Sequence, residues 1–502
     1  MQTSTGYTLV PIARSKTTMA IILLSAVISL GDISSGTPPT DMDITFAVEK
    51  GIAGDPAISS RLIDIDCQKG VVKLSGIVAN LLEYDRAFEV AQSTLGVIAI
   101  INRLTINPVY RPDSDIKTDI EAAFAADPVA SLYPIKISVD RATATLTGTV
   151  PSLEEQLFIG DIACKVRGLK KIDNKIAVKM TKNPSPGDIE KEIREILKWD
   201  PYLNANLISV KVQNSVVKLE GTVGSLSEKA FAHDDAILPG VIAIDDSLLL
   251  VKPWDRQFMK KAGATVIRSD DGITQSVRRA LADDSRIARF NLDVSVSNGV
   301  VTLRGKVNTL YDVELARKDA ENVTGTAHVV SMLRVRPENQ IGDSALELKV
   351  RQAVLRDPTL EKKEITPVAR NGIVRLYGNV DSYFERDYCA RMLSSIPGII
   401  DIKNFIAVIA PPQPWKDDDE IRADIEFDLQ WIAQLRDDSV AVKVDNGIAT
   451  LSGRVGTPTE LALVVETAFR SGAREVRVNI THYGERENGI FHAGDIYSSL
   501  LY

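Results

Sequence analysis

The feature that most constrains this chain is one β-hairpin pattern that occurs six times. The fourth copy, residues 294–307, alternates apolar and polar residues on both sides of Asn298-Gly299. That dipeptide favours a type I′ turn, because both of its positions take positive φ. The second strand of each copy is interrupted by a repeat glycine: Gly76, Gly148, Gly221, Gly305, Gly378 and Gly453. These glycines are 72, 73, 84, 73 and 75 residues apart, and such self-similarity predicts tandem copies of one unit.

The residues around each hairpin predict the order helix, strand, strand, helix, strand. Before the third hairpin, apolar residues recur with helical spacing at Ile189, Ile193, Ile196 and Leu197. An aspartate lies 21 residues before the repeat glycine in the first five copies, and in four of them a proline follows, which ends a helix. These aspartates are Asp55, Asp127, Asp200, Asp284 and Asp357. The sixth copy lacks the signal, with only Leu435-Arg436-Asp437 nearby.

A second glycine follows each repeat glycine after 19 or 20 residues. These glycines are Gly96, Gly168, Gly240, Gly325, Gly398 and Gly472. We expect each to cap the second helix in a left-handed conformation, before an apolar strand closes the unit. The predicted fold class is therefore α+β, with six αββαβ modules that each pack two helices on a three-stranded mixed sheet.

The glycine-bearing hairpin, the Asp-Pro pair and the glycine before an apolar last strand resemble the BON domain. That family consists of small modules of bacterial envelope and osmotic-stress proteins, and the resemblance implies the αββαβ fold. The expected modules are residues 41–109, 113–181, 186–251, 269–337, 342–411 and 417–482. Residues 252–268 would form a basic aromatic linker between the third and fourth modules, and residues 483–502 a tail.

Residues 1–36 differ from the rest and are expected to be a secretory signal. Arg14 and Lys16 precede an apolar run from Met19 to Leu30, and small residues follow it. The run is shorter than the about 20 residues that a membrane-spanning helix needs. The alternative is a disordered start with a chance apolar stretch. A signal would place the protein in the periplasm or cell envelope.

Composition argues against several functions. A net charge of −8 spread along the chain disfavours a general nucleic-acid binder. The three cysteines, Cys67, Cys164 and Cys389, fall at different places in their repeats and predict neither a disulfide framework nor a metal site. No catalytic motif or cofactor fingerprint is present. The acidic run 417–420 fits the start of a helix better than a calcium site, so no cofactor and no metal are expected.

The repeat glycines have two interpretations. In the first, they allow close backbone packing inside a strand. In the second, they let a ligand reach the bare backbone. The preceding residue varies widely, as Ser75, Thr147, Glu220, Arg304, Tyr377 and Ser452, which favours packing over one shared binding chemistry.

The linker 252–268 is the candidate for contact with an anionic membrane surface. In a helical turn, Trp254 and Phe258 would share one side and present aromatic rings beside cations, as interfacial segments do. The alternative is an ordinary linker whose aromatic residues pack on the neighbouring modules. The candidate contact residues are Lys252, Trp254, Arg256, Phe258, Lys260, Lys261 and Arg268.

The resemblance implies a non-enzymatic binding or scaffold protein of the bacterial envelope. The expected partners are phospholipid surfaces or other envelope components, with no nucleic acid. Two alternatives remain: a structural spacer or osmotic-stress protein without a specific ligand, and an enzyme whose site forms between repeats. The sequence leaves the oligomeric state and the arrangement of the modules open.

Overall fold

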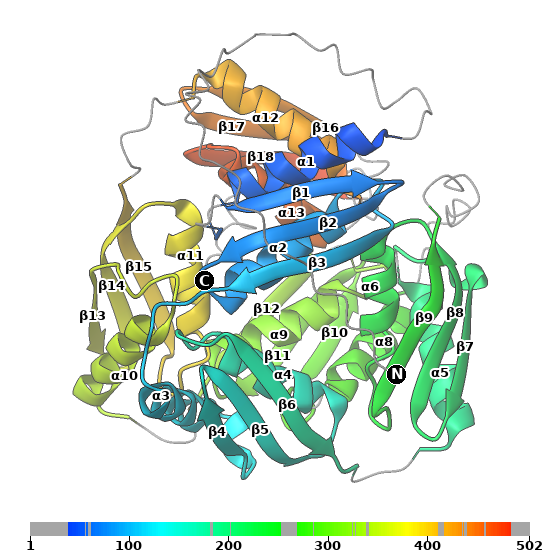
Figure 1. The fold of residues 1–502 in the computed structure, drawn as a ribbon. Helices are drawn as coiled ribbons and strands as arrows, with labels where there is room; N and C mark the ends of the chain where they lie inside the picture. The colour runs from blue at the N-terminus through cyan, green and yellow to red at the C-terminus, as the bar shows by residue number, and fades with distance from the viewer. Residues whose placement is uncertain are drawn as a thin grey trace, which may run out of the picture. The chain divides into compact units, whose positions relative to one another are not determined.

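The computed structural model describes residues 39–482, except 56, 59–61, 181–183, 201, 253–268, 285, 324, 327, 338–340, 410–415, 434, 436–438 and 456–457. Within these residues there are six three-stranded sheets, each with helices of its own (Figure 1). The predicted α+β class and the six αββαβ modules are therefore confirmed.

The first three modules have the following elements. Module one contains α1 (Asp41–Gly54), β1 (Ile63–Gln68), β2 (Val71–Val78), α2 (Leu81–Ser93) and β3 (Ala99–Ile106). Module two contains α3 (Asp113–Ala126), the 3-10 turn η2 (Ala130–Leu132), β4 (Lys136–Asp140), β5 (Thr143–Val150), α4 (Leu153–Cys164) and β6 (Lys171–Val178). Module three contains α5 (Pro186–Trp199), η3 (Ala205–Leu207), β7 (Ile208–Gln213), β8 (Val216–Val223), α6 (Leu226–Asp234) and β9 (Ala243–Val251).

The last three modules repeat the same order. Module four contains α8 (Asp270–Asp283), β10 (Asp293–Ser297), β11 (Val300–Val307), α9 (Leu310–Glu321) and β12 (His328–Val335). Module five contains α10 (Asp343–Arg356), β13 (Ile365–Arg370), β14 (Ile373–Val380), α11 (Tyr383–Leu393) and β15 (Asp401–Val408). Module six contains α12 (Asp418–Trp431), β16 (Ser439–Asp445), β17 (Ile448–Val455), α13 (Pro458–Arg470) and β18 (Glu475–His482).

Each sheet has the second strand of its module in the centre. The hairpin pairs the first two strands antiparallel, as in Val294↔Leu303 of module four. The last strand pairs parallel to the central one, as in Val301↔Val329. A parallel partner needs a crossover connection, and the second helix of each module supplies it.

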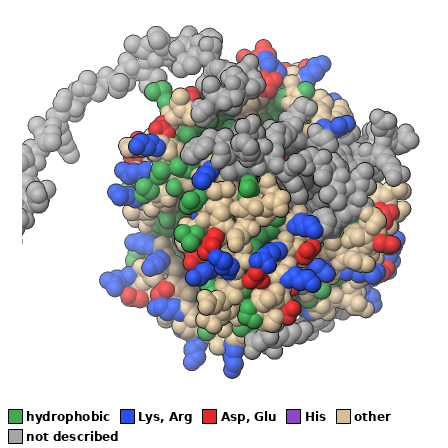
Figure 2. All heavy atoms as spheres, turned by 90° about the vertical axis from the view of Figure 1, so that its right-hand side faces the viewer, with side chains coloured by type: hydrophobic (Ala, Val, Ile, Leu, Met, Phe, Trp, Pro, Cys, Tyr) green, Lys and Arg blue, Asp and Glu red, His purple; other side chains and the backbone are tan. Residues whose placement is uncertain are grey.

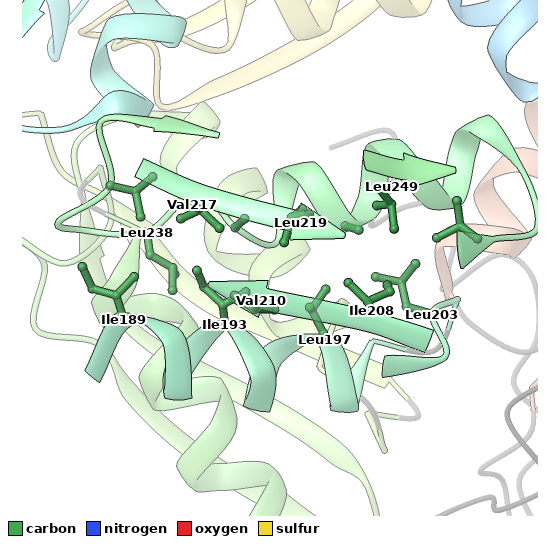
Figure 3. Packing of buried hydrophobic residues seen from close by; sticks show 14 of the residues in the cluster. Ile189, Ile193, Leu197, Leu203, Ile208, Val210, Val217, Leu219, Leu238 and Leu249 are labelled. Carbon is green, nitrogen blue, oxygen red and sulfur yellow. The ribbon is translucent and has the colours of Figure 1, made fainter. Parts of the chain in front are cut away.

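The core of each module lies between its sheet and its helices. In module three, Ile189, Ile193 and Leu197 of α5 point towards Val217 and Leu219 of the central strand (Figure 3). All five side chains are buried. Truncating such a residue to alanine costs about 2–5 kcal/mol, so the helical stripe read from the sequence is the core-facing side of the helix.

The first helix ends at an aspartate in five modules, as the sequence predicts. The Asp127 carboxylate accepts hydrogen bonds from the backbone N–H groups of Val129 and Ala130, both at 2.8 Å. Asp357 does the same with Thr359 and Leu360. The aspartate side chain thus stabilises the turn that follows the helix. This explains why the helix of module four ends without a following proline. Module six has Ile432 at this position.

The second glycine caps the second helix in module six, where Gly472 follows α13 at φ +114° and its N–H donates to the Phe469 carbonyl at 3.1 Å. In the other five modules the glycine lies further from the helix end, so that prediction is wrong there. Helix α2 ends at Ser93 with Thr94 as its C-cap at φ −74°, and Gly96 follows in the turn before β3 at φ +88°. An added Cβ at Gly96 would lie 3.0 Å from the Ile44 side chain. The glycine is needed because the turn passes against the first helix.

At three junctions, successive modules contact each other through the first residue of a second helix. Leu81 of module one packs against the core of module two, and Leu153 of module two lies in the core of module three. Leu310 of module four packs in the same way against the core of module five. These leucines come soon after the hairpin in the sequence. The contact with the neighbouring module is therefore made by a residue close to the hairpin.

Modules one and six are joined through their backbones. Thr94 and Ile432 form an antiparallel bridge. On either side of it, the Leu95 N–H donates to the Trp431 carbonyl at 2.9 Å and the Ala433 N–H donates to the Ser93 carbonyl at 3.0 Å. The aspartate that ends the first helix elsewhere is replaced by isoleucine where this bridge forms.

Side chains extend the junction of modules one and six. The rings of Phe46 and Phe427 meet edge to face with centroids 5.5 Å apart. Lys50 lies 3.9 Å above the Phe427 ring and 2.9 Å from the Asp424 carboxylate. A lysine held between a ring and a carboxylate ties α1 to α12.

Candidate interaction surfaces

The hairpin turns are held by an aspartate from the first helix. The two Asp41 carboxylate oxygens accept the N–H groups of Lys69 and Gly70 at 2.7 and 2.8 Å. The same pair of hydrogen bonds is made by Asp113, Asp270, Asp343 and Asp418. Module three has Pro186 at this position. Sequence reasoning missed this contact, although these aspartates all lie 35 residues before their repeat glycine.

All six turns have positive φ at both central residues, including those without glycine. Ala142 and Ser215 both have φ +61°. The aspartate contact also accounts for part of the acidic run 417–420. Asp417 caps helix α12 and Asp418 holds the hairpin turn.

The second helices of modules one to five begin with a side-chain cap and a buried acid, a further feature that sequence reasoning missed. In module three, Ser225 accepts the Glu228 N–H, while the Glu228 carboxylate accepts the N–H of Gly224 at 2.6 Å. The spacing Ser/Thr/Asn-x-x-Glu/Asp after each hairpin is the signal that could have revealed it. Glu83, Asp312 and Glu385 likewise accept backbone N–H groups just before their helices. Glu155 of module two instead accepts the Tyr133 hydroxyl at 3.4 Å.

The repeat glycines lie where the second strand passes the residue before the first strand. Gly76, Gly221 and Gly378 have φ between +127° and +141°, and an added Cβ would lie about 2 Å from a backbone carbonyl oxygen. At Gly148 and Gly305 the nearest atom is instead the end of a side chain, at 2.8 and 2.7 Å. This geometry supports the packing interpretation. A shallow hollow borders the sixth repeat glycine, Gly453.

The basic linker falls almost wholly outside the described residues. Lys252 follows β9, and its backbone N–H donates to the Val223 carbonyl at 2.8 Å. Trp254, Arg256, Phe258, Lys260, Lys261 and Arg268 lie in the segment 253–268, outside the described residues. Their predicted membrane contact stays a prediction.

The outward faces of the sheets carry mixed charge. On the side of the molecule in Figure 2, Lys and Arg side chains are interspersed with Asp and Glu. On module three, Lys211 and Glu220 form an ion pair of 2.9 Å across adjacent strands. The outward face of module five differs, because Tyr377 and Phe405 stack on it with centroids 5.4 Å apart.

Carboxyl groups gather where modules two and four meet. The Arg286 guanidinium binds Asp284 at 2.7 Å and Glu154 of the other module at 2.9 Å. Burial, and then the Asp284 charge, raise the pKa of Asp319 to about 8. One Asp319 carboxyl oxygen is buried without a hydrogen-bond partner. A second such oxygen belongs to Asp235, at the equivalent position of module three, and its pKa is also raised by burial.

The cysteines have the properties of packed thiols. Burial raises the pKa of Cys67, Cys164 and Cys389 to about 12, so all three stay protonated at neutral pH. Within the described parts of the chain, no group of three or more His, Cys, Asp or Glu side chains could hold a metal ion. Nor does any helix among them have the length and apolar character needed to cross a membrane.

The fold and its surfaces define a class: a tandem array of αββαβ modules joined through helices and exposing sheet faces. The BON domain family matches residues 40–108, 112–180, 186–252, 269–337, 342–410 and 417–482. The chain therefore belongs to the BON-domain family, and the resemblance seen in its sequence is confirmed.

Two curated relatives are similar to about a quarter of the chain. Osmotically-inducible protein Y of Escherichia coli is 29% identical over 141 residues, which are 27% of this chain and 70% of the relative. The outer membrane lipoprotein DolP of Haemophilus influenzae is 26% identical over 145 residues, 28% of this chain and 75% of the relative.

The solved structures that match include the C-terminal domain of CdsD, a structural protein of the type III secretion system of Chlamydia trachomatis. That domain is 14% identical in sequence. The match covers 43% of this chain and 100% of the CdsD chain, with a TM-score of 0.12. That similarity is too low to bear on fold or function.

Proposed function

We propose that this chain is a non-enzymatic protein of the bacterial envelope, in which the BON modules form a scaffold that contacts phospholipid surfaces or other envelope components. The observation that carries the proposal is the sixfold BON module, shared with an osmotically inducible protein and an outer membrane lipoprotein. The contacts between modules support a scaffold role, because they tie the modules to one another.

Export is part of the proposal. Arg14, Lys16 and the apolar run that follows have the pattern of a secretory signal. Mass spectrometry of the protein from its host should find a mature start between Gly31 and Gly36, in a periplasmic or envelope fraction. An intact Met1 in a cytosolic fraction would contradict export.

The phospholipid contact is tested by sedimentation of the exported chain with vesicles. Vesicles that contain phosphatidylglycerol should pellet the protein, and pure phosphatidylcholine vesicles should pellet much less. Added salt should weaken the binding, because it screens charge. Failure to pellet with either vesicle would favour a spacer or osmotic-stress protein without a specific ligand.

The linker is the proposed basic contact. Its lysines and arginines would each contribute about 1 kcal/mol near an anionic leaflet. Changing Lys260 and Lys261 to Glu should weaken vesicle binding at low salt and reduce its salt dependence. Unchanged binding would leave the linker without this role.

A further inference from the structure

The outward face of module five has a composition of its own. Its three strands are in register, so outward side chains form rows across the sheet. One row contains Thr366, Tyr377 and Phe405, and the next contains Val368, Arg375 and Lys403. A third row contains Arg370, Ile373 and Asp401. These nine residues, with Ile409 just beyond β15, are called the module-five face.

The module-five face exposes apolar side chains that the fold does not bury. Tyr377 is 42% exposed and Phe405 is 56% exposed, although their rings stack nearly parallel at 13°. Val368 and Ile409 are 43% and 57% exposed. Contiguous exposed apolar side chains with a polar surround mark interaction sites more often than single exposed residues do.

The charge of this face is opposite in sign to that of the chain. Arg370, Arg375 and Lys403 face outward against one carboxylate, Asp401, which lies 3.1 Å from the Lys403 amine. The whole chain has a net charge of −8. An anionic surface would therefore be attracted to this face and repelled by the chain on average.

The aromatic pair is not required by the module fold. The two positions are occupied in the other modules by Ser75/Arg103, Thr147/Lys175, Glu220/Leu248, Arg304/Met332 and Ser452/Asn479. Each of these pairs lies across the corresponding two strands of its module, although in module three the pairing shifts by one residue between Lys218 and Glu220. Module five therefore has two adjacent rings where its siblings fold with polar, charged or aliphatic residues.

We propose that the module-five face is a docking surface for an anionic lipid layer, with Tyr377 and Phe405 at the level of the headgroups and the three cations on the phosphates. The inference rests on the proposed function and names a contact surface in addition to the linker. Tyr377 combines an apolar ring with a polar hydroxyl, which favours the membrane interface, and Phe405 adds apolar area of the kind that interfacial segments bury. Cations beside these rings add attraction to anionic lipid. This contact does not require a pocket, because the face of a three-stranded sheet can lie directly against a lipid layer.

The test uses the exported full chain and vesicle sedimentation. Tyr377→Ser with Phe405→Asn copies the module-six pair, and Arg375→Glu with Lys403→Glu reverses two cations. Loss of one cation corresponds to about a fivefold change in affinity. We expect at least tenfold weaker binding to phosphatidylglycerol vesicles for each double variant.

A matched control changes the same positions of module four, Arg304→Ser with Met332→Asn, which should change binding by no more than a single cation does. Thermal melting of every variant separates loss of binding from loss of folding. As an independent readout, the emission that Tyr377→Trp adds to that of the parent's four tryptophans should shift to shorter wavelength when phosphatidylglycerol vesicles are added.

The outcomes separate this inference from the proposed function. If the parent chain binds vesicles and both double variants bind equally well, the module-five face is not the contact and the proposed function stands. If the parent chain does not bind vesicles, both this inference and the phospholipid contact of the proposed function fail. If the variants lose binding to polyglutamate but not to vesicles, the face serves an acidic protein and the lipid assignment is overturned. An unshifted Tyr377→Trp spectrum in the bound state also overturns it.

Discussion

Replacing Gly378 with alanine should unfold module five. The new Cβ would lie 2.2 Å from the Glu364 carbonyl oxygen, whereas carbon and oxygen atoms normally stay about 3.3 Å apart or more. The two strands must then separate by about 1 Å at the Ile365↔Gly378 pair, with loss of a backbone hydrogen bond worth about 1 kcal/mol. The backbone at φ +141° adds strain of about 1–3 kcal/mol for any residue with a Cβ.

The total, about 2–4 kcal/mol, is comparable to the about 3–5 kcal/mol that one core of this size contributes. Gly305 provides the contrast. There the nearest atom to an added Cβ is the tip of the Leu292 side chain at 2.7 Å, and the nearest backbone oxygen is 3.4 Å away. The leucine can rotate, so Gly305→Ala should cost about 1–2 kcal/mol. Gly305→Val adds two methyl groups and should destabilise module four while remote modules stay folded.

Hydrogen exchange read by mass spectrometry measures the protection of each module separately, and guanidinium unfolding gives the total free energy. We expect module five to lose protection in Gly378→Ala and module four to keep most of its protection in Gly305→Ala. Equal effects of the two alanines, or a Gly378→Ala protein that unfolds like the parent, would refute the steric argument.

Three further predictions concern turns and buried charge. Ala142→Gly should stabilise the chain by about 0.5–1 kcal/mol because the turn has positive φ, whereas Ala125→Gly in α3 should destabilise it by a similar amount; thermal midpoints compare the two. Asp343→Ala removes two hydrogen bonds to the β13–β14 turn and should cost about 1–2 kcal/mol, with faster amide exchange at that turn; unaltered exchange would contradict it. Because the folded pKa of Asp319 is raised to about 8, its contribution to stability is full below the unfolded pKa and is lost as pH rises through about 8. Thermal unfolding from pH 5 to 9 should show that slope in the parent and in the exposed-site control Asp293→Asn, and a flatter slope in Asp319→Asn.

The local structure of each module could be predicted from sequence because its signals are local. The dipeptide Asn298-Gly299, the stripe Ile189-Ile193-Leu197 and the aspartates that end the first helices each act within a few residues. A two-residue hairpin also fixes which residues of its two strands face each other.

The contacts that hold the modules together could not be predicted in this way. Asp41 reaches a turn 28 residues away, and only its constant distance from the repeat glycine signals the contact. The bridge between Thr94 and Ile432 depends on how modules one and six meet, which no local pattern encodes. The stacked rings of Tyr377 and Phe405 depend on strand register, and their shared face became visible only once the sheet was built.

The junction of modules one and six has a mechanical consequence. Thr94 and Ile432 are far apart in sequence, and their bridge closes the intervening modules into a loop. Tension applied to the chain on either side of the modules would load this short bridge and the Lys50–Asp424 pair, because they join the first module to the last. The bridge is smaller than any of the sheets, so it should break first. The chain would then lengthen while the modules stay folded. A chain under tension would then extend at this junction and could re-form the bridge when the load is removed.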